Sequence, residues 1–326
     1  MGKNVRIRRG ISRAWFYVRS FAIYYLSKSI RQRMGRHLLS SLTDEELKFL
    51  EKRVDYYVTC PVFNQAQMLP CTIESYRYPF HQKQKFGTYF LDLYRSLSYF
   101  PAKLRFAYLF GDITETFSVP TIVKSRPIQQ QSNSILLKLN SERHFQWVND
   151  NTTFREKIDK AVFRNVVNQP YRALLLEKYS KHPMCDFGMT ATVYYKERKE
   201  WIKPFMSKQE QLHYKFIMCI EGHDVATNLK WVMSSQSVAV MPRPQFETWF
   251  MEGTLKPDYH YIEIAADYSN LIERLQYYTQ HPDEAEAIVR NANAFVKQFQ
   301  NKRLEHAAEL LTLRRYFTRT CQIPEL

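Results

Sequence analysis

Residues 213–242, HYKFIMCIEGHDVATNLKWVMSSQSVAVMP, have the residue types and spacing of a phosphate-binding site. A buried strand is expected to run into the turn Glu221-Gly222-His223-Asp224, and a helix to open after it with Thr227 and Asn228 near its first turn. Free backbone amides and the positive end of the helix dipole at such a start attract phosphate. Lys230 is placed to add a full positive charge. The pattern is only moderately specific, because an ordinary β-turn-α unit fits it about as well.

Two groups of polar residues nearer the N-terminus follow predicted strands. Asp112 ends the run RFAYLFGD, where a lone Asp is usually a cap or an Asx-turn. Lys124, Ser125 and Arg126 follow the run VPTIV. These three residues fit the binding of an anionic acceptor and, equally, a solvated exit from the strand.

A third group lies in the loop after the last strand of the phosphate-binding stretch. There Glu247 and Glu252 are carboxylates that could accept hydroxyl groups of a sugar or ribose. Packing of Trp249 and Phe250 in a core or lid is the favoured reading of the same loop.

Common cofactor and metal motifs are missing from the chain. None of the 8 glycines stands in a G-x-G arrangement, which excludes the dinucleotide fingerprint and a Walker A loop. The sequence contains neither Asp-x-Asp nor HExxH, so we expect no metal site and no cofactor. The 5 cysteines form no CxxC pair, which favours reduced thiols in a cytoplasm.

The elements that position these residues are predicted from hydrophobic patterning. The run SLTDEELKFLEKRVDYY begins a helix with a Ser/Thr cap, and a second helix is expected around Thr88–Leu97. From Lys160 strands and helices alternate, which is typical of a parallel, doubly wound sheet. The expected strands are AVFRN, TATVYY, YKFIMCI, SVAVMP and HYIEI, and the helices are YRALLLEKYS, residues 225–235 and SNLIERLQYY. Residues 283–318 are expected to be helical throughout.

Several motifs in the same order resemble glycosyltransferase family 90. They are EGHDVATNLKW, PRPQFETWFMEG, FGDIT and PTIVKSRPI, and the likeness covers nearly the whole chain after the basic N-terminal segment. The family includes protein O-glucosyltransferases, capsule xylosyltransferases and bacterial lipopolysaccharide-core transferases, and this chain is most similar to the bacterial branch. The resemblance implies a GT-B fold, α/β with two facing Rossmann-like domains and C-terminal helices that pack across them.

The resemblance also implies a binding site for a UDP-sugar donor. The family's FRG motif corresponds to Phe163-Arg164-Asn165, and Arg172 follows it as a second candidate for the diphosphate. Many relatives have Ser at the position of Asn228 and Arg at that of Lys230. The donor-binding residues expected here are Arg164, Val166, Arg172, Gly222, Asp224, Val225, Ala226, Thr227, Asn228, Leu229, Lys230 and Glu247.

By the same resemblance, Asp112 corresponds to the catalytic base, although Gly111 replaces the usual Arg and the following Pro is missing. The implied reaction is inverting and independent of metal, moving a hexose, glucose above all, to a hydroxyl of a lipopolysaccharide-core sugar. Two alternatives remain open: a related transferase that acts on a capsule polysaccharide or a protein with another UDP-sugar, and a non-catalytic scaffold that binds membrane or nucleic acid.

Positive charge is concentrated at the N-terminus. The chain carries 47 Lys and Arg against 32 Asp and Glu, a net charge of +15, and the first acid is Asp44. Ile11, Trp15, Val18, Ala22 and Leu26 recur at helical spacing within this basic stretch. This stripe either lies on an anionic membrane surface or packs on the protein's own core, whereas a nucleic-acid-binding arm is disfavoured because no recognised module follows.

The expected organisation has four parts. Residues 1–43 form a basic amphipathic segment, 44–154 the acceptor and catalytic-base domain, 155–283 the UDP-sugar-binding domain, and 284–326 helices that return to the N-terminal domain. No apolar run approaches the roughly 20 residues that span a bilayer. We therefore expect a cytoplasmic protein, peripheral on the inner face of the bacterial inner membrane, with no nucleic-acid partner.

Overall fold

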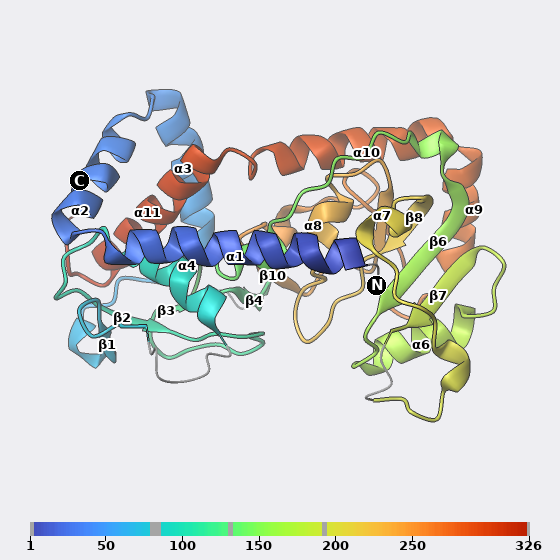
Figure 1. The fold of residues 1–326 in the computed structure, drawn as a ribbon, viewed down its shortest axis with the longest axis horizontal. Helices are drawn as coiled ribbons and strands as arrows, with labels where there is room; N and C mark the ends of the chain where they lie inside the picture. The colour runs from blue at the N-terminus through green and yellow to red at the C-terminus, as the bar shows by residue number, and fades with distance from the viewer. Residues whose placement is uncertain (1–2, 79–85, 130–132, 191–193, 325–326) are drawn as a thin grey trace. The chain divides into compact units, whose positions relative to one another are not determined.

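The computed structural model describes residues 3–78, 86–129, 133–190 and 194–324 (Figure 1). The chain is a mixed α/β protein with parallel sheets, and it divides into two compact units. The five-stranded unit consists of Met1–Arg9, His144–Pro244 and Glu252–Gln298. The four-stranded unit consists of Gly10–Arg143, Gln245–Met251 and Phe299–Leu326. The short segment 245–251 therefore belongs with residues far from it in the sequence.

The five-stranded unit is built on one parallel sheet with the strand order β11-β9-β8-β6-β7. Its strands are β6 (Ile158–Asn165), β7 (Cys185–Met189), β8 (Tyr214–Met218), β9 (Val238–Met241) and β11 (Ile262–Glu263). Its helices are α6 (Pro170–Tyr179), α7 (Lys208–Gln211), α8 (Leu229–Val232), α9 (Leu271–Gln280) and α10 (Pro282–Lys297), with short 3-10 turns at Phe154–Glu156, Lys199–Trp201 and Glu252–Thr254. The alternation of strand and helix predicted from the sequence is confirmed.

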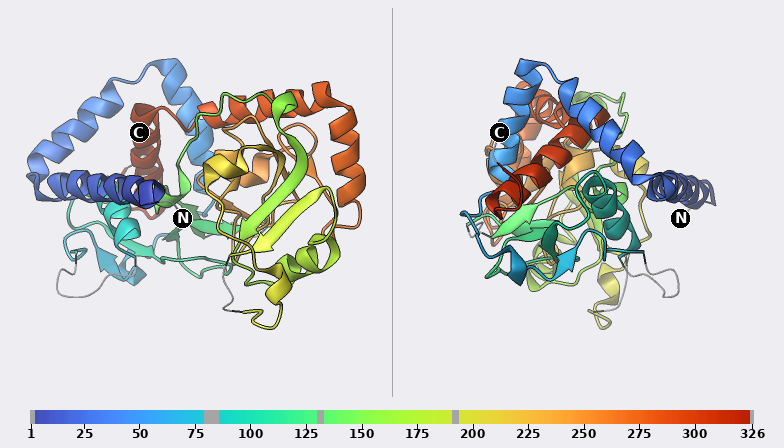
Figure 2. Two further views of the ribbon diagram at one scale, coloured as in Figure 1. Left: turned by 45° about the vertical axis from the view of Figure 1, so that its right-hand side comes forward. Right: turned by 90° about the vertical axis from the view of Figure 1, so that its left-hand side faces the viewer.

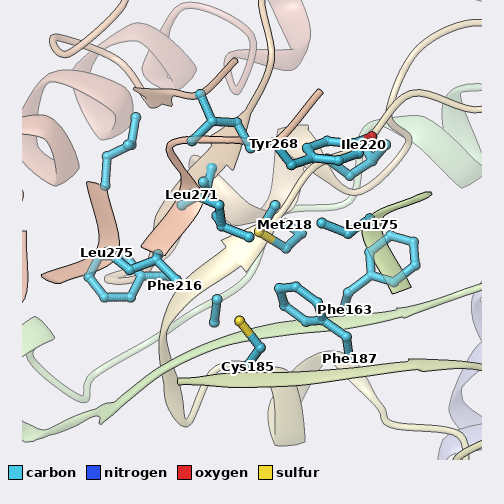
Figure 3. Packing of buried hydrophobic residues seen from close by; sticks show 14 of the residues in the cluster. Phe163, Leu175, Cys185, Phe187, Phe216, Met218, Ile220, Tyr268, Leu271 and Leu275 are labelled. Atoms are coloured by element: carbon cyan, nitrogen blue, oxygen red, sulfur yellow. The ribbon is translucent and has the colours of Figure 1, made fainter. Parts of the chain in front are cut away.

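Large apolar side chains from the strands and helices of this unit meet in its core (Figure 3). Phe163 of β6 and Phe187 of β7 sit opposite each other in the parallel register, and the two strands run side by side (Figure 2). Phe216 of β8 is also fully buried, as are Leu175 of α6 and Leu271 of α9. Burial on both faces explains why these strands read as continuous apolar runs in the sequence.

The four-stranded unit contains a sheet with the order β1-β2-β3-β5 and a separate antiparallel pair, β4 with β10. Its strands are β1 (Cys71–Thr72), β2 (Arg105–Tyr108), β3 (Thr121–Val123), β4 (Ser125–Pro127), β5 (Ser134–Leu136) and β10 (Phe246–Thr248). Its helices are α2 (Lys28–Ser40), α3 (Asp44–Tyr57), α4 (Gly87–Leu97), α5 (Ser141–His144) and α11 (Lys302–Arg319), with a 3-10 turn at Ala66–Met68 and most of α1 (Lys3–Tyr25). β2, β3 and β5 are parallel to one another, whereas β1 is antiparallel to β2.

Local signals set the ends of the helices in this unit. Thr43 and Glu46 form a capping box at the start of α3, in which each side chain accepts a hydrogen bond from the other residue's backbone. The two predicted helices, α3 and α4, are thus confirmed. Asn301 caps α11, which packs against α3 and α4.

Two sequence predictions differ from the structure, and a third falls partly outside the described residues. The predicted helix over 225–235 is only the single turn α8. After it, the amides of Ser234 and Ser235 donate to the carbonyls of Trp231 and Val232 at 3.2 and 2.9 Å, three residues back rather than four, and the two hydroxyls donate to the same carbonyls at 2.9 and 2.6 Å.

The C-terminal helical run breaks between α10 and α11, where residues 298–301 separate a helix of the five-stranded unit from one of the four-stranded unit. The predicted strand TATVYY is preceded by β7, which ends at Met189; its residues 191–193 lie outside the described part of the chain.

Candidate functional site

The loops after β6 and β8 lie at the same edge of the five-stranded sheet. β6 ends at Asn165 and β8 at Met218, and the strands pair in parallel with Ala161 opposite Phe216. Ligands of parallel α/β sheets bind beyond the carboxyl ends of the strands. The nucleotide-sugar loop that the family resemblance implies, 225–230, follows β8 together with the predicted binding residues Gly222 and Asp224, and so lies at this edge. We call 222–230 the donor loop.

Arg172 of α6 connects the loops after β6 and β8 through hydrogen bonds to both. Its guanidinium donates to the carbonyl oxygens of Glu221 at 2.7 Å, Ile220 at 2.7 Å and Val166 at 2.8 Å, and to the side chain of Asn168 at 3.3 Å. The residue is buried, and this burial lowers the pKa of its guanidinium. Among the described residues no carboxylate pairs with it at ion-pair distance. The strand ends therefore carry a buried cation whose direct partners are backbone carbonyls and a side-chain amide, with Tyr171, Tyr268 and Glu221 favouring its charge from farther away.

Gly222 is where the loop approaches Arg172 most closely. A Cβ atom at this position would lie 3.3 Å from Nη2 of Arg172, tighter than ordinary van der Waals contact. The carbonyl of Gly222 accepts a hydrogen bond from the hydroxyl of Tyr171, and its amide donates to the carbonyl of Asp224 at 3.0 Å. Gln169 contacts the ring of His223 at 2.9 Å. The start of α6 thus holds the beginning of the donor loop, at Gly222 and His223.

The remaining donor-loop residues differ in how accessible they are. Asp224, Val225, Ala226 and Leu229 are buried, whereas Thr227 and Asn228 are partly exposed. Asn228 donates from Nδ2 to the carbonyl of Met218 at 2.9 Å, which fixes the loop to the end of β8. With α8 limited to one turn, we expect individual loop amides, rather than a long helix dipole, to meet an anion here.

Lys230 is part of a buried ion pair. Its side chain is fully buried, and its ammonium lies 2.7 Å from the Glu252 carboxylate, which is 1% exposed. The ring of Phe145 lies 5.9 Å from the same ammonium. The sequence prediction placed Lys230 on a diphosphate; the structure adds a partner, Glu252, that sequence spacing did not indicate.

Arg164 belongs to a different cluster. It donates to Asp186 Oδ1 at 2.6 Å, and Lys203 and Tyr214 donate to the same carboxylate at 2.8 and 2.6 Å. These hydrogen bonds hold the pKa of Asp186 well below its usual value despite partial desolvation. Val166, by contrast, is 37% exposed and meets Arg172 through its carbonyl.

In the four-stranded unit, Asp112 is held by Lys124. The Asp112 carboxylate lies 2.6 Å from the Lys124 ammonium, and its side chain is 39% exposed while that of Lys124 is 3% exposed. Gly111, with a φ of 118°, makes the turn before Asp112 that other residues rarely adopt. Ser125 accepts a hydrogen bond from the amide of Ile113 at 3.2 Å. β3 and β4 therefore fix a half-exposed carboxylate in place.

Arg126 and Glu247 face each other across the β4–β10 pair. Both are fully buried, with the guanidinium 2.8 Å from the carboxylate. Arg126 also donates to backbone carbonyls of Tyr56 at 2.7 Å and Ser134 at 2.8 Å, and the hydroxyl of Tyr56 donates to Glu247. The predicted acceptor residue Arg126 and the predicted donor residue Glu247 thus bind one another inside the four-stranded unit.

Packing explains the aromatic residues after Glu247. Trp249 is 1% exposed, stacks on Tyr57 at 4.0 Å between centroids, and donates to Glu305 at 2.9 Å. Arg53 and Lys138 also contact Glu305, at 2.7 and 2.6 Å. The packing alternative for this loop is confirmed. The buried acid that holds Trp249 is Glu305, which lies among apolar residues of α11 and was not identified from the sequence.

Neither a metal-binding cluster nor a membrane-spanning helix occurs among the described residues. No cluster of His, Cys, Asp and Glu has an arrangement that could hold a metal ion. None of the helices in the described ranges is long and apolar enough to cross a bilayer.

Comparison with known proteins gives the family. The model described as glycosyl transferase family 90 matches residues 138–311, more than half of the chain. O-glucosyltransferase LpsA of Dichelobacter nodosus is 39% identical over 270 residues, which cover 82% of this chain and 83% of that protein. The chain belongs to glycosyltransferase family 90. Protein O-glucosyltransferase 3 of Homo sapiens is 21% identical over 195 residues, 59% of this chain and 37% of that protein.

The family 90 match contains the whole donor loop together with Arg172 and Lys230. Asp112 precedes the matched stretch, as do Lys124, Ser125 and Arg126. Their roles stay predictions. Tyr171 and Gln169, which clamp the donor loop, were missed by sequence reasoning, although they adjoin Arg172 at the predicted helix start.

Substitutions in the Lys230–Glu252 pair test whether Lys230 stabilises the fold by neutralising Glu252. Lys230→Met should lower the free energy of unfolding by roughly 3–5 kcal/mol, because it leaves a buried carboxylate unpaired. The double variant Lys230→Met/Glu252→Gln should recover most of that loss, as measured by urea unfolding. If the single and double variants lose the same free energy of unfolding, the loss does not come from leaving the Glu252 carboxylate unpaired.

Proposed function

We propose that the chain transfers glucose from UDP-glucose to a hydroxyl of a lipopolysaccharide-core sugar, with inversion at the anomeric carbon. The observation that carries the proposal is Arg172, a buried cation at the carboxyl ends of β6 and β8 with no acid paired to it. Membership of family 90 and the relative named O-glucosyltransferase support glucosyl transfer. The lipopolysaccharide acceptor follows from the bacterial branch that the sequence motifs resemble.

The donor diphosphate would meet the loop at Thr227 and Asn228. These residues are partly exposed and lie between the Arg172 clamp and α8. A diphosphate there would gain loop amide donors and the field of the Arg172 cation, both stronger in a desolvated site than in water. Lys230 would add less to that field, because its charge is largely compensated by Glu252. We therefore assign Arg172 the larger share of diphosphate binding.

A GT-B arrangement is part of the proposal. Each unit contains a sheet with parallel strands, which is what two Rossmann-like domains require. The five-stranded unit would bind the donor, and the four-stranded unit would supply Asp112 and the acceptor site. Lys124 would serve as a positioning residue for Asp112, because its buried ammonium fixes one carboxylate oxygen.

The proposed reaction is a single displacement. Asp112 takes the proton from the acceptor hydroxyl while that oxygen attacks the anomeric carbon of the donor. The bond from that carbon to the β-phosphate oxygen breaks as the new glycosidic bond forms, and UDP leaves with the electron pair from the opposite face. Arg172 and the loop amides stabilise the charge that develops on the diphosphate. Metal independence rests on the lack of an Asp-x-Asp motif, and activity retained in EDTA would support it.

Arg172 gives the direct test of the donor site. Arg172→Gln should weaken UDP binding roughly 10- to 100-fold, because it removes the charge that offsets the diphosphate. Arg155→Gln is the matched control, since that arginine is half exposed and pairs with Asp283 and Glu286 on the surface. Calorimetry gives the affinities, and a melting curve shows whether each variant is folded. A folded Arg172→Gln protein with wild-type UDP affinity would contradict the assignment.

Asp112 gives the test of catalysis. Asp112→Asn should lower kcat by roughly 10²- to 10⁴-fold, the usual contribution of a general base, while UDP affinity stays at the wild-type value. The matched control is Asp55→Asn, another carboxylate of the four-stranded unit that pairs with a cation, Arg315. Unchanged turnover in Asp112→Asn would remove it from the role of base.

A panel of UDP-sugars distinguishes the donor. Calorimetry and donor hydrolysis should favour UDP-glucose over UDP-galactose and UDP-xylose. Preference for another sugar would leave the fold and site intact but change the transferred group. No thermal shift with any UDP-sugar would instead support a non-catalytic scaffold.

A further inference from the structure

Helix α1 has two apolar faces, and one of them attaches it to the four-stranded unit. Phe21 packs edge-on against Tyr78 with 5.3 Å between ring centroids, and Tyr24 packs against Tyr94 at 4.5 Å. The hydroxyl of Tyr24 also accepts a hydrogen bond from the amide of Tyr78 at 3.3 Å. This inner face accounts for how the helix is held.

The other face of α1 carries Trp15, Val18 and Ala22 of the stripe predicted from the sequence, and these three are exposed. Leu26 of that stripe is partly buried just after the helix, and the side chain of Ile11 lies outside the described part of the structure. Trp15 is 68% exposed, Val18 59% and Tyr25 72%, and Ala22 between them is exposed too. Spacings of three and four residues place these side chains on one side of the helix. The reading in which the stripe packs on the protein's own core is therefore wrong for Trp15, Val18 and Ala22. We call Trp15, Val18, Ala22 and Tyr25 the outer stripe of α1.

Basic residues lie on the same two helices as the outer stripe. Among the side chains that the structure describes on α1 and α2, the exposed basic ones are Arg13, Arg19, Lys28, Arg33 and Arg36. The sequence has no acid before Asp44, so these charges are not offset within the segment. α2 adds two exposed apolar side chains, Ile30 and Met34, each 49% exposed.

Arg31 has a different task in the turn between α1 (the long blue helix of Figure 1) and α2. It is buried, and its guanidinium donates to the carbonyl oxygens of Ile23 and Tyr24, each at 3.1 Å, and of Leu26 at 2.5 Å. These carbonyls lie at and just after the C-terminal end of α1, where a buried cation supplies hydrogen-bond donors and interacts favourably with the helix dipole. The turn that joins the two basic helices is thereby fixed, and α2 is further held where Gly35 packs against Tyr99.

We propose that the outer stripe of α1 lies in the headgroup region of an anionic membrane, with the basic residues of α1 and α2 around it. An exposed apolar stripe beside uncompensated cations is the pattern of a helix that lies in the interface plane. At 23 residues α1 is about 35 Å long, enough to place the whole stripe along the surface. The surface is independent of the transfer reaction, and it would keep the chain beside a lipid-linked acceptor.

The charge and the apolar character of this surface favour an anionic membrane over a second copy of the chain or a nucleic acid. A second copy of the chain would bring a like-charged segment against the first, which is unfavourable. Nucleic acid would satisfy the cations but would leave Trp15 and Val18 exposed beside a phosphate backbone. An anionic bilayer satisfies both the apolar stripe and the cations.

A point substitution in the stripe tests the proposal without disturbing the inner face. Val18→Glu places a carboxylate in the stripe, and Val62→Glu is the matched control, because Val62 is a 63% exposed valine of the same unit outside the basic segment. Flotation of the full chain with phosphatidylglycerol vesicles should show roughly 10-fold weaker partitioning for Val18→Glu and wild-type partitioning for Val62→Glu. Vesicles of phosphatidylcholine alone should bind the wild-type chain weakly, and added salt should weaken binding to the anionic vesicles.

Fluorescence provides a second measurement. Brominated lipid should quench part of the tryptophan emission of the wild-type chain, and Trp15→Phe should remove that part. The proposal is overturned if Val18→Glu floats as the wild type does, or if quenching survives in Trp15→Phe. It is also overturned if Val18→Glu only dissociates a dimer in sedimentation, or if the segment binds nucleic acid and not vesicles. UDP affinity measured on the same proteins keeps this outcome separate from that of the proposed transfer reaction.

Discussion

The candidate donor site depends on a buried positive charge with no carboxylate at ion-pair distance among the described residues. Arg172 satisfies four carbonyl or amide acceptors from the loops after β6 and β8, but it has no paired carboxylate in the described structure. Charged groups are costly to bury unless an opposite charge compensates them. A diphosphate at the adjoining loop would supply that charge, so the same contacts that assemble the loop also prepare it for an anion. Gly222 is part of this arrangement, because a Cβ atom there would lie 3.3 Å from the guanidinium and crowd it.

The other buried cations of the molecule show the contrast. Lys230 pairs with Glu252, and Arg126 pairs with Glu247, in each case with both partners almost completely buried. Pairs of this kind contribute little net stability but are costly to break, and they fix how neighbouring segments pack. Arg126 in particular ties β4 to β10 and to the end of α3 through backbone carbonyls. Such residues hold the scaffold, whereas Arg172 and the half-exposed Asp112 remain suited to meet a substrate.

In the N-terminal segment, helix α1 has two apolar faces with different surroundings. α1 uses an aromatic face to attach to the four-stranded unit and leaves a second apolar face exposed among arginines. A single helix can serve both purposes because its 3.6-residue period separates the two sets of side chains around the axis. The residues that attach α1 to the fold are therefore different from those of its exposed face.

Periodicity and turn chemistry in the sequence determined the alternation of strands and helices, the capped start of α3 and the position of the donor loop after β8, because these depend on neighbours in the chain. The family motifs were equally visible, since they are runs of adjacent residues. The tertiary structure alone decided which charges are paired: Glu252 lies 22 residues from Lys230, and Glu247 lies 121 residues from Arg126. It also decided that α8 is one turn and that the outer stripe of α1 is exposed. Burial and pairing are set by which segments pack together, and one chain's linear pattern does not specify those partners.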